Sequence, residues 1–217
     1  MIKRRYISLG STCGVAYQLQ KLGLKKETLP FDWVKSSNLQ AVWKCMYNGF
    51  NIFGHGLKYC RESTKHSILK TEEWSDIATS TSYIYQNSSG IMFFHDFNTI
   101  YKDETDPIYL LFKEKYTRRL DRLESLFITG DHLIFIRDEH RPKSLHLDIL
   151  IAFVEWLVSK LKNGTTMEFI LIINNPNKFN FDFESKLNNY RIILINDTEK
   201  MMDWQRNNLD WQRILQI

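Results

Sequence analysis

The chain has 217 residues, a net charge of +4 and 43% hydrophobic residues. This apolar content is enough for a full core, so intrinsic disorder is excluded. The 29 basic residues are interspersed with 25 acidic ones, which is not the pattern of a nucleic-acid-binding protein. The length fits one domain over residues 1–217, because no stretch in the middle has the composition of a linker.

The cysteines indicate the cellular compartment and limit the kinds of site that the chain can form. Cys13, Cys45 and Cys60 are widely spaced and odd in number, which argues against a disulfide framework and favours a reducing compartment. Their spacing also predicts no metal site. The sequence shows no signal peptide and no apolar run long enough to cross a bilayer. We therefore expect a cytoplasmic protein with no membrane partner.

The first half of the chain contains a strand, two helices and a hairpin. Residues 5–10 predict a strand, and residues 15–22 a helix that ends at Gly23. Residues 29–33 (LPFDW) predict a structured loop, and residues 38–48 a second helix. Residues 49–81 show no clear pattern. Residues 82–87 and 91–97 predict two strands joined by a hairpin turn.

The second half alternates between helices and apolar strands. Asp106 and Pro107 are typical of a helix start, and apolar spacing continues this helix to Phe127. Strands are expected at 132–137, 167–173 and 191–195, with helices at 145–161 and near the end of the chain. Continuously apolar strands are typical of a parallel sheet that is buried on both faces. The sequence therefore predicts a three-layer, Rossmann-like α/β fold, with a mostly parallel sheet and helices on both faces.

Cys13 is the first candidate for chemistry, because it follows the first strand at the start of the predicted helix. Backbone N–H groups at a helix N-terminus would lower the pKa of a thiol and could stabilise an oxyanion. Gly10 permits the tight turn that this requires. A semi-buried cysteine at a helix start is, however, more often structural. Phosphate binding by the Gly-Ser-Thr turn is a weaker alternative, since the lysine of a P-loop is missing.

A nucleophilic thiol needs a base, and His95 is the candidate. It lies late in the predicted strand 91–97, among aromatic residues, where a histidine is more often a core residue. Asp96 is adjacent but would point the other way on a regular strand. Asp32 is an alternative orienting group, although it could simply cap its own turn.

Polar residues also follow the predicted parallel strands, at Ser11, Arg137–Asp138, Asn174–Asn175 and Asn196–Asp197. The carboxyl ends of parallel strands share one edge, where α/β proteins bind ligands. Ser11, Arg137 and Asn174 could therefore hold an anionic or sugar-like ligand, although most loops are polar.

Two other groups of charged residues are expected at the surface. His140 lies between charged residues, which favours an exposed position. Arg118, Arg119 and Arg122 have acidic neighbours and predict a solvated, ion-paired helix face, with an anionic ligand as the alternative.

Three segments together resemble an uncharacterised family described as papain-like cysteine peptidases: residues 8–13 (SLGSTC), 30–33 (PFDW) and 94–97 (FHDF). The arginine-bearing helix at 116–119 and the strand at 135–137 are similar as well. The resemblance covers most of the chain. It implies that Cys13 is the nucleophile, that His95 is the base, and that Asp32 or Asp96 orients the imidazole. It also implies a papain-like α+β fold as the alternative to the Rossmann-like one.

Two classes of function follow. The first is a cysteine-dependent hydrolase or acyl transferase, in which Cys13 attacks a peptide or small-molecule substrate and Gly10 and Ser11 lie in the turn that holds the oxyanion. The second is a non-catalytic binding module for an anionic or sugar-like ligand at the carboxyl edge of the sheet, with Ser11, Arg137 and Asn174. Neither class needs a cofactor. A protein that only forms interactions, with an exposed aromatic patch, is a third alternative.

Overall fold

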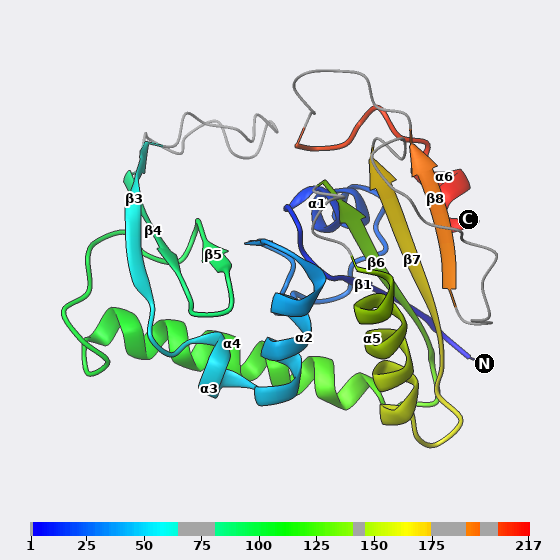
Figure 1. Ribbon diagram of the computed structural model, residues 1–217, viewed down its shortest axis with the longest axis horizontal. Coiled ribbons are helices and arrows are strands. Elements are labelled where there is room, and N and C mark those ends of the chain that lie inside the picture. Colours follow the sequence, from blue (N-terminus) through cyan, green and yellow to red (C-terminus); the bar gives the residue numbers. More distant parts are fainter. Residues whose placement is uncertain (1, 65–80, 141–145, 175–189, 196–203) are drawn as a thin grey trace.

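Two four-stranded sheets lie side by side above one long helix (Figure 1). The computed structural model describes residues 2–64, 81–140, 146–174, 190–195 and 204–217. The parallel sheet has the order β1-β6-β7-β8, with β1 (Arg4–Ser8), β6 (His132–Glu139), β7 (Thr166–Asn174) and β8 (Tyr190–Ile195). The antiparallel sheet has the order β2-β5-β4-β3, with β2 (Val34–Ser36), β3 (Lys58–Thr64), β4 (Thr81–Gln86) and β5 (Ile91–Phe93).

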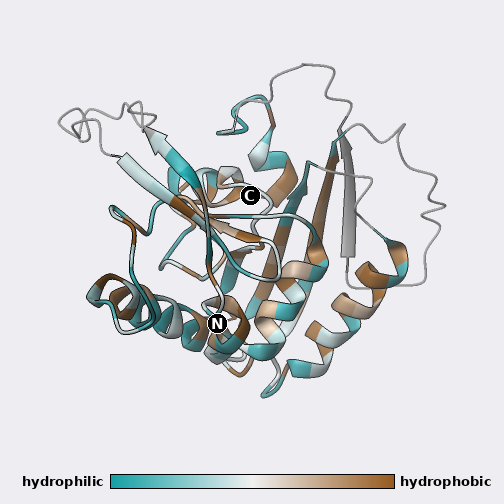
Figure 2. Ribbon diagram, turned by 60° about the vertical axis from the view of Figure 1, so that its left-hand side comes forward, coloured by the Kyte–Doolittle hydropathy of each residue, from teal (hydrophilic) through white to brown (hydrophobic). Residues whose placement is uncertain are grey.

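Helices pack against both faces of the parallel sheet. Successive side chains of a strand point to opposite faces. Leu133 and Phe135 of β6 therefore join one core, and Ile134 and Ile136 join another. Strands β6 and β7 accordingly carry hydrophobic residues along most of their length (Figure 2). The α/β class and the expectation of parallel, doubly buried strands are confirmed. The first core lies under α2 (Leu39–Asn48), α4 (Pro107–Leu126) and α5 (Leu147–Lys160), and the second under α1 (Gly14–Lys21) and α6 (Trp211–Leu215).

The antiparallel sheet is the main departure from the sequence-based expectation of one mostly parallel sheet. The β4–β5 hairpin forms as predicted, with the Asn87 side-chain oxygen accepting the Ile91 N–H at 2.9 Å. Strands β2 and β3 were not predicted. Strand β5 ends at Phe93 and not at residue 97, and beyond it the Asp96 side chain accepts a hydrogen bond from Tyr116 of α4. His95 therefore lies in a bend after the strand.

The helix α4 runs beneath both sheets and joins their cores (Figure 1). Its start is the predicted one: the Asp106 side chain accepts the N–H of Ile108 at 2.9 Å, and Pro107 follows. One continuous apolar cluster includes Phe135 of the parallel sheet and Phe93 of the antiparallel sheet. This shared core agrees with the single-domain expectation, which stays a prediction. No described helix is long and apolar enough to cross a membrane.

The end of the chain packs against the start of α1. The Gln18 side chain donates to the carbonyl oxygen of Gln205 and, at 3.1 Å, to Asn207 Oδ1. The Trp211 indole donates to the carbonyl oxygen of Arg206 at 2.8 Å. Gly14 allows this approach, because a Cβ there would lie 2.6 Å from the Trp204 carbonyl oxygen.

We expect Gly14→Ala to lower the free energy of unfolding by about 1–3 kcal/mol, the usual cost of overpacking. Alanine is the better helix former, so a loss of stability would come from the clash with residues 204–206. Urea unfolding measures the effect, with Gln20→Ala at an exposed position of α1 as the control. Equal stability of the two variants would contradict this packing.

Candidate active site

Cys13 lies at the end of a strained turn between β1 and α1. Gly10 and Ser11 both adopt the left-handed region, with φ of 72° and 74°. This conformation is unfavourable for a serine, so the surroundings must stabilise it. The Ser11 N–H does so by donating to Ser36 Oγ of β2 at 2.9 Å. Cys13 then forms the N-cap of α1, and its side chain makes no capping hydrogen bond.

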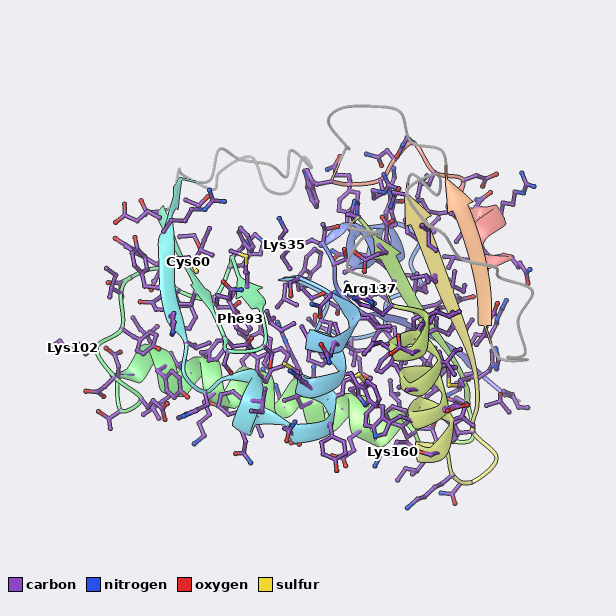
Figure 3. The ribbon with its side chains drawn as sticks, viewed as in Figure 1. Lys35, Cys60, Phe93, Lys102, Arg137 and Lys160 are labelled. Atoms are coloured by element: carbon purple, nitrogen blue, oxygen red, sulfur yellow. The ribbon has the colours of Figure 1, made fainter. Side chains whose placement is uncertain are left out.

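Arg137 holds this turn from β6. Its guanidinium donates to Ser36 Oγ at 2.8 Å and to the carbonyl oxygen of Leu9 at 3.1 Å, and it pairs with Glu139 at 2.8 Å. The side chain is fully buried at the junction of the two sheets (Figure 3). Arg137 was expected to face a ligand, but in this structure it binds groups of the protein itself. Alternation along β6 is the reason, because Arg137 and Glu139 share the face that points toward β2.

The electrostatic surroundings of the Cys13 thiol are the reverse of those expected at a helix N-terminus. Burial, followed by the charges of Asp32 and Asp96, raises the pKa of the Cys13 thiol to about 12. The charges of Lys25 and Lys35 act in the opposite direction but are weaker. The prediction of a lowered pKa is therefore wrong for this state of the protein. Most of the thiol is therefore protonated at neutral pH, and fast reaction needs a base.

Asp32 closes its own turn and also lies near the thiol. Its Oδ2 accepts the Leu29 N–H at 2.7 Å and pairs with Lys25 Nζ at 3.0 Å. Burial raises the pKa of this carboxyl, while Lys25 opposes the shift. The turn-capping alternative is thus confirmed, and the proposed orientation of His95 by Asp32 stays a prediction.

Asp96 brings the FHDF segment to the same region as Cys13. Its Oδ2 accepts the Tyr116 hydroxyl at 3.0 Å, and its Oδ1 pairs with Lys115. Tyr116 is fully buried, and burial followed by Asp96 raises the pKa of its hydroxyl well above the ordinary value. His95 is exposed and packs beside Phe94. No hydrogen bond joins Cys13 to His95 in the described part of the chain, so their pairing stays a prediction.

A second polar network lies on the opposite face of the parallel sheet. Asp138 Oδ2 contacts His140 Nε2 at 3.1 Å and accepts from Arg206 Nε at 2.7 Å. The Asn174 amide donates to Asp138 Oδ1 at 2.7 Å and accepts from Arg206 at 2.6 Å. His140 Nε2 also lies 3.4 Å from Thr12 Oγ1, beside Cys13. The network therefore contacts the cysteine-bearing turn on the side opposite to Arg137.

This network corrects two expectations. Asn174 is buried, and both ends of its amide bind inside the protein, so it does not face a ligand here. His140 was expected at the surface, yet its side chain is only 11% exposed. The spacing of Asp138 and His140 was a usable signal, because residues two apart in an extended segment share a face. Nothing in the sequence indicated Arg206. Asn175, Asn196 and Asp197 lie outside the described residues.

Metal binding finds no support at this edge of the sheet. Within the part of the chain that the structure describes, no three side chains of His, Cys, Asp or Glu form a group that could hold a metal ion. The groups near Cys13 are carboxylates that already pair with lysines.

The fold and the site define an α/β protein with a thiol at the start of the helix that follows its first parallel strand. The chain belongs to the family described as "Putative papain-like cysteine peptidase" (DUF1796), whose model matches residues 4–177. The family resemblance is thereby confirmed. An uncharacterized protein of Acanthamoeba polyphaga mimivirus is similar to the chain, with 49% identity over 216 residues, which span 97% of this chain and 96% of that protein. No solved structure matches the chain.

We expect Asp32→Asn to speed the alkylation of Cys13 by iodoacetamide about threefold to tenfold at pH 8, since it removes a charge that opposes the thiolate. An asparagine oxygen can still accept the Leu29 N–H, so the turn is kept. Mass spectrometry of the labelled peptides gives the rate, with Asp121→Asn on the exposed side of α4 as the control. In the wild type, the exposed Cys60 should react faster than Cys13. Unchanged labelling in Asp32→Asn would contradict the described surroundings of the thiol.

Asp138 makes a pH-dependent contribution to stability. Burial alone would raise the pKa of its carboxyl, but His140, Arg206 and Asn174 together lower it. A lowered folded-state pKa stabilises the protein above the unfolded value of about 3.9, and this stability is lost as the pH falls through the folded value. We therefore expect Asp138→Asn to be less stable near pH 7 and to lose less stability on acidification.

Urea unfolding between pH 7 and pH 3 measures this dependence. Asp121→Asn is the matched control, since Asp121 is exposed on α4. Parallel pH profiles for the wild type and Asp138→Asn would refute the role of this carboxylate.

Proposed function

We propose that the protein is a cysteine-dependent hydrolase with Cys13 as its nucleophile. The observation that carries the proposal is the position of this thiol. It lies at the first turn of α1, at the carboxyl edge of a parallel sheet, in a chain of the cysteine peptidase family. This edge is where α/β proteins bind ligands. The substrate is a peptide or another acyl donor.

His95 is the proposed base. It follows β5 of the antiparallel sheet, and the charge of the adjacent Asp96 reaches the Cys13 thiol. A cysteine on a helix that faces a histidine from an antiparallel sheet is the papain-like arrangement, and this chain has a helix-start cysteine and a histidine next to an antiparallel strand. The exposed position of His95 requires its imidazole to approach the thiol when substrate binds, as catalytic hydrogen bonds often tighten only then.

The raised pKa of Cys13 defines the order of proton transfer. His95 takes the proton from Sγ as the Sγ–carbon bond forms, and it returns this proton to the leaving group. Water, activated by the same imidazole, then cleaves the acyl-thioester and restores the thiol. The thiolate is therefore formed during attack and is not stored in the resting protein.

The oxyanion is stabilised by the backbone of the same turn. The N–H groups of Gly10 and Ser11, which were expected in this role, already contact Ser8 Oγ and Ser36 Oγ. Among the described residues, the N–H groups of Thr12 and Cys13 donate no hydrogen bond. We assign the oxyanion to these two donors, because preorganised backbone N–H groups stabilise developing charge.

The non-catalytic binding module has less support. Its three ligand groups on Ser11, Arg137 and Asn174 are all engaged within the protein. An anionic or sugar-like ligand at those residues would have to displace buried hydrogen bonds. A cytoplasmic location stays a prediction.

Acyl transfer to Cys13 tests the proposed function. We expect activated esters and peptide thioesters to give an acyl-enzyme on Cys13, detected by mass spectrometry after acid quench. Cys13→Ala should abolish this adduct. His95→Gln should slow its formation about 100-fold or more, since general-base catalysis contributes that much.

His55→Gln is the matched control, because the His55 side chain is also exposed, at 71%, and its ring pairs with Glu104 and not with the cysteine-bearing turn. Its acylation rate should stay within a few-fold of the wild type. If the acyl group forms on other residues, or equally on Cys13 in all variants, the proposed mechanism is wrong.

A further inference from the structure

Three basic residues lie on one face of α4. Lys115, Arg119 and Arg122 are spaced at i, i+4 and i+7, so they share this face. Lys115 pairs with Asp96. Arg122 lies 3.5 Å from Glu27 and donates to the Thr28 carbonyl oxygen at 3.4 Å. The two outer cations are therefore already engaged with groups of the protein.

Arg119, between them, is different. Among the described residues it forms no hydrogen bond and no ion pair. Its guanidinium carbon lies over the Tyr116 ring, 5.0 Å from the centroid, and the side chain is half-buried. Stacking on a buried ring orients the guanidinium plane while its N–H donors stay open.

Arg119 also shares its neighbours with the thiol. Its charge acts on Asp32 and on Tyr116, and Cys13 is coupled electrostatically to the same two groups. Lys25 and Lys35 are the cations whose charges act on the thiol itself, so Arg119 would bind a charged group that extends from the reacting carbon toward Asp32 and Tyr116. The nearby Lys25 and Lys115 are already paired with carboxylates. The single positive charge of Arg119 therefore matches a singly charged group better than a phosphate dianion.

We infer that Arg119 is a specificity residue that binds a carboxylate group of the substrate beside the acyl carbon attacked by Cys13. A guanidinium matches a carboxylate with two parallel N–H···O bonds. The favoured substrates are then acyl compounds that carry a carboxylate near the reacting carbonyl group. This inference rests on the proposed function for its substrate, but its test needs no turnover.

Two alkylating reagents that differ only in charge provide this test. Iodoacetate carries a carboxylate, and iodoacetamide carries an amide. Both transfer their CH₂ group to Sγ and release iodide. Both reagents react with the same thiolate, so the ratio of their rates at Cys13 does not depend on the pKa of the thiol. The exposed Cys60 on strand β3 is the internal reference (Figure 3). Mass spectrometry gives both ratios from one protein sample.

In the wild type, we expect the iodoacetate-to-iodoacetamide ratio at Cys13 to exceed that at Cys60 by about threefold or more, the size of a partly exposed ion pair. Without an open cation, Asp32 and Asp96 would repel iodoacetate and place the ratio below that of Cys60. Arg119→Met should remove the preference, and Arg119→Lys should keep part of it. Arg118→Met is the matched control, since the Arg118 side chain is 58% exposed and pairs with Glu114.

The outcomes separate the two proposals. A wild-type ratio at or below that of Cys60, or one that Arg119→Met leaves unchanged, overturns the inference even if Cys13 forms an acyl-enzyme. A preference that depends on Arg119 supports the carboxylate site even if Cys13 forms no acyl-enzyme, in which case only the hydrolase is refuted.

Discussion

The buried guanidinium of Arg137 joins the two sheets at the point where the candidate site forms. It connects β6 to the end of β1 through the Leu9 carbonyl oxygen and to β2 through Ser36 Oγ. The same Ser36 oxygen accepts the Ser11 N–H and so stabilises the left-handed turn before Cys13. Removing one partner of a buried ion pair typically costs about 3–5 kcal/mol. The position of the thiol therefore depends on Arg137 remaining paired with Glu139.

The location of Cys13 follows from this junction. Side chains of odd number on β6 face the second sheet, and those of even number face α1 and α6. Arg137 thus stabilises the turn from one side, while Asp138 and His140 reach Thr12 from the other. The thiol lies between groups from both sheets, because Asp32 precedes β2 and Asp96 follows β5. Neither sheet alone would provide these surroundings.

Much of the fold was predictable because its signals are local. Apolar runs gave the parallel strands, and the cap at Asp106 gave the start of α4. The antiparallel sheet was less predictable, because β2 is three residues long and depends on pairing with β5. For the site, the residue types were identified but not their partners. The pKa of Cys13 was predicted with the wrong sign, because helix-terminal position is local whereas burial and the charges of Asp32 and Asp96 depend on tertiary structure.

A half-buried, protonated thiol has a consequence for selectivity. A preformed thiolate reacts with many electrophiles, whereas a thiol with a pKa of about 12 reacts slowly until a base is brought to it. If His95 is this base, as proposed, its exposed position makes the step depend on the molecule that occupies the site. Lys25–Asp32 and Lys115–Asp96 are paired charges, which limits long-range attraction of ions, and the inferred role of Arg119 is to select among ligands. Reactivity and recognition would then be provided by different elements, α1 and α4, which come together only because both pack against the junction of the two sheets.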